Sequence, residues 1–107
     1  MASPAAVDRF LAELAPLLRT HGATAAYLFG SHARGTADAY SDVDVIVVAP
    51  STRPFVERFK DYLPAIAGAG IGVDLLVYTP EEFDQLRAEE RPFLVHALEG
   101  AKQIHAG

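Results

Sequence analysis

The sequence predicts an α/β or α+β domain in which a small mixed β-sheet is flanked by helices. Segments with a helical spacing of apolar residues alternate with short apolar runs of strand length, and glycine or proline separates them. Half of the 107 residues are hydrophobic, which is enough to bury one core, and no repeat or linker divides the chain. We therefore expect one domain over residues 1–107.

The first element is expected to be a helix that ends at His21 and Gly22. Ser3 followed by Pro4 has the form of an N-cap with proline at the first helical position. Apolar residues then recur three or four positions apart, at Val7, Phe10, Leu11, Leu14, Leu17 and Leu18. Pro16 interrupts this run and is expected to kink or split the helix.

Strands are expected over residues 23–29, 42–49 and 73–78, because each is an apolar run of strand length. The second is the clearest, since it is rich in valine and is closed by Pro50. The tail, residues 101–105, is predicted to form a short edge strand.

Three further helices are expected between and after these strands. Ser51 is predicted to cap a helix over residues 52–67. The segment 79–89 begins with Thr-Pro-Glu-Glu, which has the form of a capping box with proline at the first helical position. Residues 91–98 predict a short helix that glycine ends.

Charge and composition exclude several classes of function. Acidic residues outnumber basic ones by 14 to 9 and the basic residues form no dense run, so the chain does not fit a non-specific nucleic-acid binder. No apolar run approaches the roughly 20 residues that span a bilayer, and the start lacks the features of a secretory signal. Cysteine is absent, so no thiolate metal site is expected. We expect a cytoplasmic protein with no membrane or nucleic-acid partner.

The pair Gly30-Ser31 stands where the first strand gives way to a helix start. Backbone N–H groups at the beginning of a helix point outward and favour an anion, and glycine allows a phosphate to approach closely. Taken alone, a Gly-Ser pair after a strand is also typical of an ordinary turn.

Three aspartates stand in the second and third predicted strands. Asp42 and Asp44 are two residues apart, so both carboxylates project from the same face. Like charges this close are unfavourable unless they are compensated, and Mg²⁺ prefers such oxygen ligands. The alternative to such a metal site is that Asp42 lies in solvent at the start of the strand and only Asp44 is partly buried. Asp74 interrupts an apolar strand, and the three carboxylates converge if the two strands are neighbours.

These motifs resemble the minimal nucleotidyltransferase (MNT) family of the DNA polymerase β-like superfamily. Phe-Gly-Ser-His-Ala-Arg-Gly-Thr-Ala over residues 29–37, followed by Tyr-Ser-Asp-Val-Asp over residues 40–44, is similar to that family's signature. Val-Asp-Leu-Leu over residues 73–76 resembles the segment that carries its third carboxylate. The resemblance covers nearly the whole chain and implies the polymerase β-like nucleotidyltransferase fold.

The resemblance also implies roles for single residues. Gly30 and Ser31 would bind the triphosphate of the nucleotide. Asp42 and Asp44 would bind both metal ions, and Asp74 would join them at the ion that activates the attacking hydroxyl. Arg34 would contact a phosphate or the acceptor, with a surface ion pair as the alternative. Two other groups are set aside: His32 is not expected to be catalytic, and the aromatic residues Tyr27, Phe29, Phe55, Phe59 and Phe93 are expected to pack in the core.

The resemblance implies a metal-dependent enzyme that moves a nucleoside monophosphate, AMP from ATP, onto a hydroxyl group. Mg²⁺ is the expected cofactor and Mn²⁺ an acceptable substitute. Small members of the family pair with a helical HEPN toxin and act as its antitoxin by adenylylating a tyrosine. Two alternatives remain open: a binding module that masks its partner by contact alone, and a catalytic subunit that modifies a small molecule such as an aminoglycoside. The oligomeric state also remains open.

Overall fold

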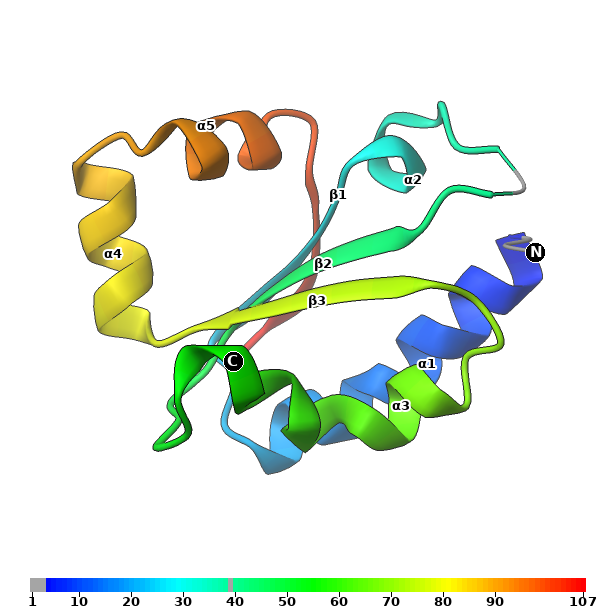
Figure 1. The fold of residues 1–107 in the computed structure, drawn as a ribbon, viewed down its shortest axis with the longest axis horizontal. Helices are drawn as coiled ribbons and strands as arrows, with labels where there is room; N and C mark the ends of the chain where they lie inside the picture. The colour runs from blue at the N-terminus through cyan, green and yellow to red at the C-terminus, as the bar shows by residue number, and fades with distance from the viewer. Residues whose placement is uncertain (1–3, 39) are drawn as a thin grey trace.

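A four-stranded mixed sheet forms the centre of the molecule in a computed structural model that describes residues 4–38 and 40–107. The strand order is β3-β2-β1-β4. β1 pairs antiparallel with both β2 and β4, whereas β2 pairs parallel with β3. The strands are β1 (Ala25–Phe29), β2 (Val43–Val48), β3 (Val73–Tyr78) and β4 (Lys102–Ala106) (Figure 1). The mixed sheet confirms the predicted fold class, and the tail does form an edge strand.

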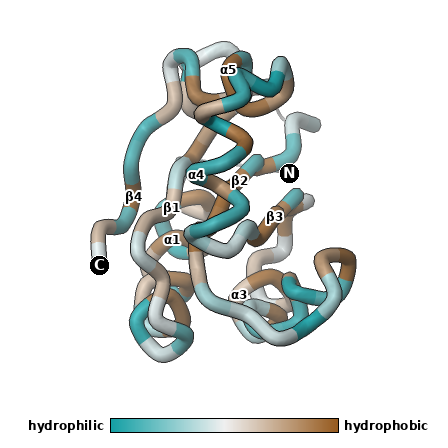
Figure 2. Tube along the Cα trace, turned by 90° about the vertical axis from the view of Figure 1, so that its left-hand side faces the viewer, coloured by the Kyte–Doolittle hydropathy of each residue, from teal (hydrophilic) through white to brown (hydrophobic). Residues whose placement is uncertain are grey.

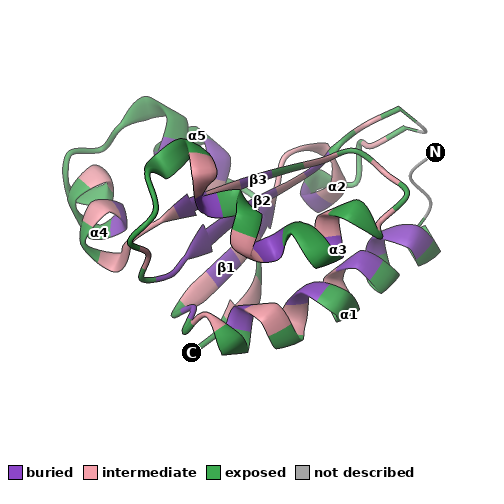
Figure 3. Cartoon of the chain, turned by 60° about the horizontal axis from the view of Figure 1, so that its bottom comes forward, coloured by how far each residue is buried: buried purple, intermediate pink, exposed green. Residues whose placement is uncertain are grey.

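Helices cover both faces of this sheet. They are α1 (Pro4–Thr20), α2 (Ser31–Arg34), the 3₁₀ helix η1 (Phe55–Tyr62), α3 (Leu63–Ala67), α4 (Pro80–Ala88) and α5 (Pro92–Leu98). One core cluster joins α1, η1 and α3 to one face of the sheet, and a second joins α4 and α5 to the other. Figure 3 shows the buried residues of α1 turned toward the sheet.

The alternation of side chains along β2 assigns each residue to one of these two faces. Val43, Val45 and Val47 are fully buried in the cluster with α1, whereas Ile46 and Val48 belong to the cluster with α4 and α5. Strands β2 and β3 are accordingly hydrophobic along most of their length (Figure 2). Asp44 is two residues before Ile46, so its side chain projects from the face that α4 and α5 cover.

The first helix is continuous, so of the two outcomes predicted for Pro16, a kink or a split, the split is wrong. α1 passes through Pro16 and ends at Thr20, followed by Gly22 with φ 69°. Pro16 lies on the exposed side of α1, where water can satisfy the carbonyl that loses its donor. The predicted N-cap, Ser3, lies outside the described residues.

The predicted helix over residues 52–67 was also wrong, because two prolines divide this segment. Pro54 pushes the residue before it out of the helical region, so η1 begins only at Phe55. Ser51 caps no helix, since its Oγ accepts a hydrogen bond from the Arg53 backbone N–H at 3.2 Å. Pro64 cannot donate a backbone hydrogen bond and lies at the start of α3.

The capping box of α4 is confirmed. The Thr79 hydroxyl accepts from the Glu82 backbone N–H at 3.2 Å, and the Glu82 carboxylate accepts from the Thr79 N–H at 2.9 Å. Glu82 also forms an ion pair with Arg58, the one charged side chain among the described residues that is buried. Arg58 in turn donates to the carbonyl groups of Arg53 and Val77, which ties η1 to β3 and α4. Within residues 4–38 and 40–107, none of the helices has the length and hydropathy needed to cross a membrane.

Candidate active site

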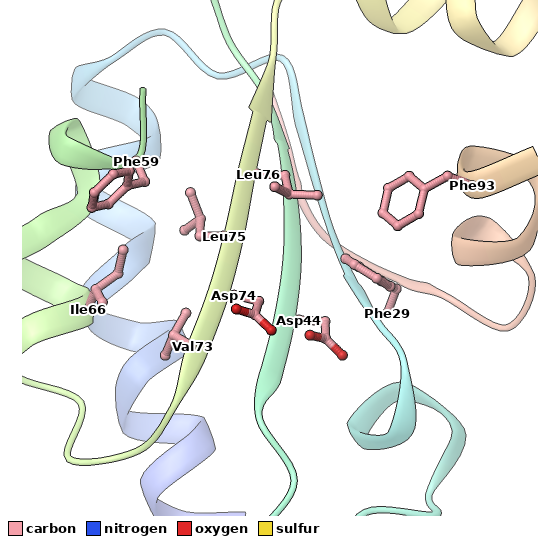
Figure 4. A pocket seen from close by; sticks show the side chains of 9 residues that line it. All are labelled: Phe29, Asp44, Phe59, Ile66, Val73, Asp74, Leu75, Leu76 and Phe93. Atoms are coloured by element: carbon pink, nitrogen blue, oxygen red, sulfur yellow. The ribbon is translucent and has the colours of Figure 1, made fainter. Parts of the chain in front are cut away.

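Asp44 stands in the middle of a row of side chains that crosses three strands. In the sheet register it is the partner of Phe29 on β1 and of Asp74 on β3. Residues paired in this way project from the same face of a sheet and lie close together. Figure 4 shows both carboxylates side by side at the centre of a pocket. The strands that carry the aspartates are therefore neighbours, as their convergence requires.

The surroundings of Asp44 favour its protonated form. Partial burial raises the pKa of Asp44, and the negative charges of Asp74 and Asp42 raise it further. A hydrogen bond with the Asp74 carboxyl group also raises this pKa, and the nearby His32 has a smaller, opposite effect. Three like charges thus meet at one place, which costs free energy unless a cation or a proton compensates them.

Asp42 lies just before β2 and is exposed, whereas Asp44 is half-buried. This difference in exposure matches the alternative that the D-x-D spacing left open. Asp42 is still close enough to act on the pKa of Asp44, so the two carboxylates share one electrostatic site.

Two glycines allow the main chain to approach the carboxylates closely. Gly30 has φ 74°, and a Cβ atom there would overlap the Asp44 carboxylate. A Cβ atom at Gly72 would overlap the Asp42 carboxylate in the same way. The Val43 backbone N–H donates to the Gly72 carbonyl at 2.9 Å, which fixes this approach. Both carboxylates therefore lie directly against backbone.

Ser31 begins the short helix α2, as the sequence predicted. The Gly30 carbonyl accepts hydrogen bonds from the N–H groups of Ala33 and Arg34, at 3.1 Å each. His32 Nε2 lies 3.1 Å from the Ser41 carbonyl oxygen and so ties α2 to the segment before Asp42.

Arg34 is exposed at the end of α2. It has no ion pair with any residue within 4–38 or 40–107, so the surface ion pair considered for it is not found there. Its guanidinium is free to meet an incoming anion.

The loop before Asp42 is stabilised by its own polar side chains. The Ser41 hydroxyl donates to Asp38 Oδ1 at 3.1 Å and accepts from the Asp38 backbone N–H at 3.0 Å. The Tyr40 N–H also donates to Asp38 Oδ1, at 2.9 Å. The Tyr40 and Ser41 donors lower the pKa of Asp38, with the Tyr40 backbone as the largest cause. Ser41 therefore braces the turn before Asp42.

A cleft of about 470 Å³ opens over Asp44 and Asp74. Its lining is otherwise apolar and consists of Phe29, Phe59, Ile66, Val73, Leu75, Leu76 and Phe93 (Figure 4). The expectation that five aromatic residues pack in the core was wrong for three of them: Phe55, Phe59 and Phe93 are 37%, 36% and 49% exposed. Sequence reasoning missed Phe59 and Phe93 as cleft residues, since neither stands near a motif.

The donor set at this site suits a hard divalent cation. The side chains that could hold an ion are all carboxylates, and the like charges around Asp44 favour a cation there. Across the described part of the chain, no three acidic, histidine or cysteine side chains are grouped closely enough to hold an ion by themselves. Mg²⁺ is commonly held by one or two carboxylates together with substrate phosphates, so the site fits an ion that arrives with a nucleotide.

A family model described as a nucleotidyltransferase domain matches residues 8–68, more than half of the chain. The chain belongs to this family. The matched segment includes Gly30, Ser31, Asp42 and Asp44, while Asp74 lies beyond it. The protein is therefore a nucleotidyltransferase, as its motifs predicted.

Solved structures share the fold of this nucleotidyltransferase. A chain of a toxin–antitoxin complex with AMP-PNP is 24% identical, with a TM-score of 0.66 and coverage of 91% of this chain and 73% of that one. A chain of a tri-AMPylated Shewanella oneidensis HEPN toxin in complex with MNT antitoxin is 21% identical, with a TM-score of 0.59 and coverage of 92% and 71%. At these identities the likeness concerns the fold alone. No curated protein matches the chain significantly in sequence.

Proposed function

We propose that this nucleotidyltransferase transfers AMP from ATP to the hydroxyl of a tyrosine on a HEPN-type toxin and thereby acts as an antitoxin. The observation that carries the proposal is the in-register pairing of Asp44 with Asp74, one strand away from Gly30-Ser31. Phosphoryl-type transfer depends mainly on positioning and on electrostatic stabilisation, and this arrangement supports both. We treat residues 1–107 as the single domain that performs the reaction.

The nucleotide would lie with its triphosphate against Gly30 and Ser31. The main chain at Gly30 lies directly against the Asp44 carboxylate, so phosphate oxygens bound at the start of α2 would lie beside the proposed metal site. The exposed Arg34 guanidinium, on the same short helix, would contact a phosphate by charge-assisted hydrogen bonds. The donor is ATP in this proposal, because one structural neighbour contains AMP-PNP.

Asp42, Asp44 and Asp74 would hold Mg²⁺ or Mn²⁺ together with the phosphates. Bound divalent cations lower the pKa of an acceptor hydroxyl and stabilise negative charge on the triphosphate. The acceptor oxygen forms a bond to the α-phosphorus while the bond from that phosphorus to pyrophosphate breaks. Asp74, the exposed carboxylate of the central pair, accepts the proton of the hydroxyl.

The acceptor in this proposal is a protein. Two structural neighbours come from toxin–antitoxin complexes, and one of them contains a HEPN toxin that carries AMP groups. The cleft is open and largely apolar, so an aromatic side chain presented by a partner can enter it. The net charge of −5 suits a partner with a basic surface.

The experiment incubates the full chain with Mg²⁺, α-labelled ATP and an extract of its source organism. We expect one labelled protein band, and mass spectrometry should locate AMP on a tyrosine of a helical protein. The Asp42→Asn/Asp44→Asn variant is the control and should give no label. An unlabelled partner that co-purifies with the chain would support masking by contact instead, and label on a small molecule would support the aminoglycoside-type alternative.

A further inference from the structure

The apolar wall formed by Phe93 and Phe29 lies beside the proposed reaction centre. Phe29 is the direct neighbour of Asp44 in the sheet register, so its ring starts one strand away from the carboxylates. The Phe93 ring meets it edge to face, with centroids 6.0 Å apart and an interplanar angle of 88°. Figure 4 shows both rings on the same side of the aspartates, with Phe93 carried by α5.

Phe93 is 49% exposed although it belongs to a helix that packs against the sheet. Its neighbours on α5, Leu94 and Ala97, are buried in the core cluster, so the helix is anchored without it. An exposed aromatic ring is unremarkable alone, but this ring lines the same cleft as Asp44 and Asp74. It offers a flat apolar surface to one side of the carboxylates.

We propose that Phe93, braced by Phe29, forms the platform that binds the base of the donor nucleotide. The inference rests on the proposed function, since it assumes a nucleotide in this cleft. Along the cleft, α2 lies below the carboxylates in Figure 4, and Phe93 and Leu76 lie above them. The order of α2, carboxylates and Phe93 matches the order of terminal phosphates, reacting phosphorus and base in a nucleotide.

A second apolar wall of the cleft lies on the other face of the sheet, around the edge strand β3. It includes Phe59 of η1 and Ile66 of α3, which Figure 4 shows across β3 from Asp74. Asp44 and Asp74 project instead from the face that α4 and α5 cover, as does the cleft side with Phe93. Phe59 is therefore separated from the carboxylates by β3, whereas Phe93 is not.

The test compares binding of two ligands to the full chain in Mg²⁺ by titration calorimetry. ATP carries a base, whereas inorganic tripolyphosphate carries only the phosphates. Stacking of a base on an aromatic ring contributes about 1–3 kcal/mol, so Phe93→Ala should weaken ATP binding roughly 5- to 150-fold. The same change should leave tripolyphosphate binding unaltered. Phe93→Trp should retain ATP binding, and Phe93→Leu, which keeps apolar bulk for the fold, should weaken it.

Phe59→Ala is the matched control in the same cleft, because Phe59 is 36% exposed and lies on the other wall. It should leave ATP affinity unchanged. Three results would overturn the inference: unaltered ATP affinity in Phe93→Ala and Phe93→Leu, equal loss of ATP and tripolyphosphate binding, or a loss of ATP affinity in Phe59→Ala alone. The wild-type chain separates these failures from a failure of the assumption behind the proposed function: if it binds neither ligand, no nucleotide occupies this cleft, whereas binding of both ligands leaves the role of Phe93 as the only point under test.

Discussion

Asp44 and Asp74 face each other across two neighbouring parallel strands, paired in register and on the same face of the sheet. Their mutual repulsion, added to the burial of Asp44 and the charge of Asp42, raises the pKa of Asp44. A protein that keeps such an arrangement gives up stability in the absence of a cation. The same two carboxylates that are proposed to support nucleotidyl transfer therefore lower the stability of the metal-free protein.

Replacing Asp44 with Asn should stabilise the metal-free protein while it abolishes nucleotidyl transfer. The amide has nearly the same shape and removes one of the like charges. We expect the free energy of unfolding at neutral pH to rise by up to about 1 kcal/mol, because solvent screens part of the repulsion. Urea titration of both forms in EDTA measures the change. A loss of stability in the variant would mean that the Asp44 carboxylate is needed for the fold.

Replacing Gly72 with Ala should destabilise the protein through Asp42. The new Cβ atom would overlap the Asp42 carboxylate, so the loop before β3 or the aspartate must move. Because Gly72 and Asp42 are both exposed and the carboxylate can turn aside, we expect a cost of up to about 1 kcal/mol by thermal or urea unfolding. In the Asp42→Ala background the same glycine change should cost much less. Equal costs in both backgrounds would rule out this contact as the reason for glycine.

The Arg58–Glu82 ion pair should make stability depend on acidic pH. Arg58 lowers the pKa of Glu82, mainly through its hydrogen bond. A depressed carboxylate pKa stabilises the fold above the ordinary value of about 4.3, and this stabilisation is lost as the pH falls through the folded-state pKa. Because Glu82 is 43% exposed, we expect the pair to contribute about 1 kcal/mol.

The variant Glu82→Gln isolates this ion pair, since glutamine still completes a capping box. Its stability should fall less than that of the wild type between about pH 5 and pH 3. Glu81→Gln, at the exposed position next to it, is the control and should keep the wild-type slope. Parallel pH profiles for Glu82→Gln and the wild type would show that the pair is energetically silent.

Glu90 connects α4 to α5 in a conformation that costs free energy. It has φ 51°, and among the described residues it is the only one other than glycine with a positive φ. Asparagine tolerates this left-handed region better than other non-glycine residues. Glu90→Asn should raise the free energy of unfolding by up to about 1 kcal/mol. Glu90→Ala also removes the charge but keeps the strain, so a gain of the same size in that variant would contradict the explanation.

The sequence predicted the central features of the site because they depend on local spacing. The apolar runs around Asp42, Asp44 and Asp74 predict the strands that carry them. Because side chains alternate along a strand, the two-residue spacing of Asp42 and Asp44 also predicts that they project from the same face. The short helix after Gly30 was predicted for the same local reason. What the sequence left open was the exposure of Asp42, which depends on exactly where β2 begins.

Errors arose where the outcome depends on tertiary surroundings or on competing local signals. Pro16 leaves α1 continuous because it lies on the solvent side, and nothing in its immediate sequence tells which side that is. Pro54 and Pro64, by contrast, were visible signals for a divided helix between β2 and β3. Phe59 and Phe93 belong to segments far apart in the chain, so only the folded arrangement brings them to one cleft.

The central claim is that the aspartate site transfers a nucleotidyl group, and the position of the transferred label tests it most directly. The chain would be incubated with Mg²⁺ and its co-purified protein partner, in parallel with ATP labelled at the α- or the γ-phosphate. We predict that the partner gains label from α-labelled ATP alone, and that Asp44→Asn, which remains folded, transfers none. Label from γ-labelled ATP, or undiminished transfer by Asp44→Asn, would contradict the assignment of this site.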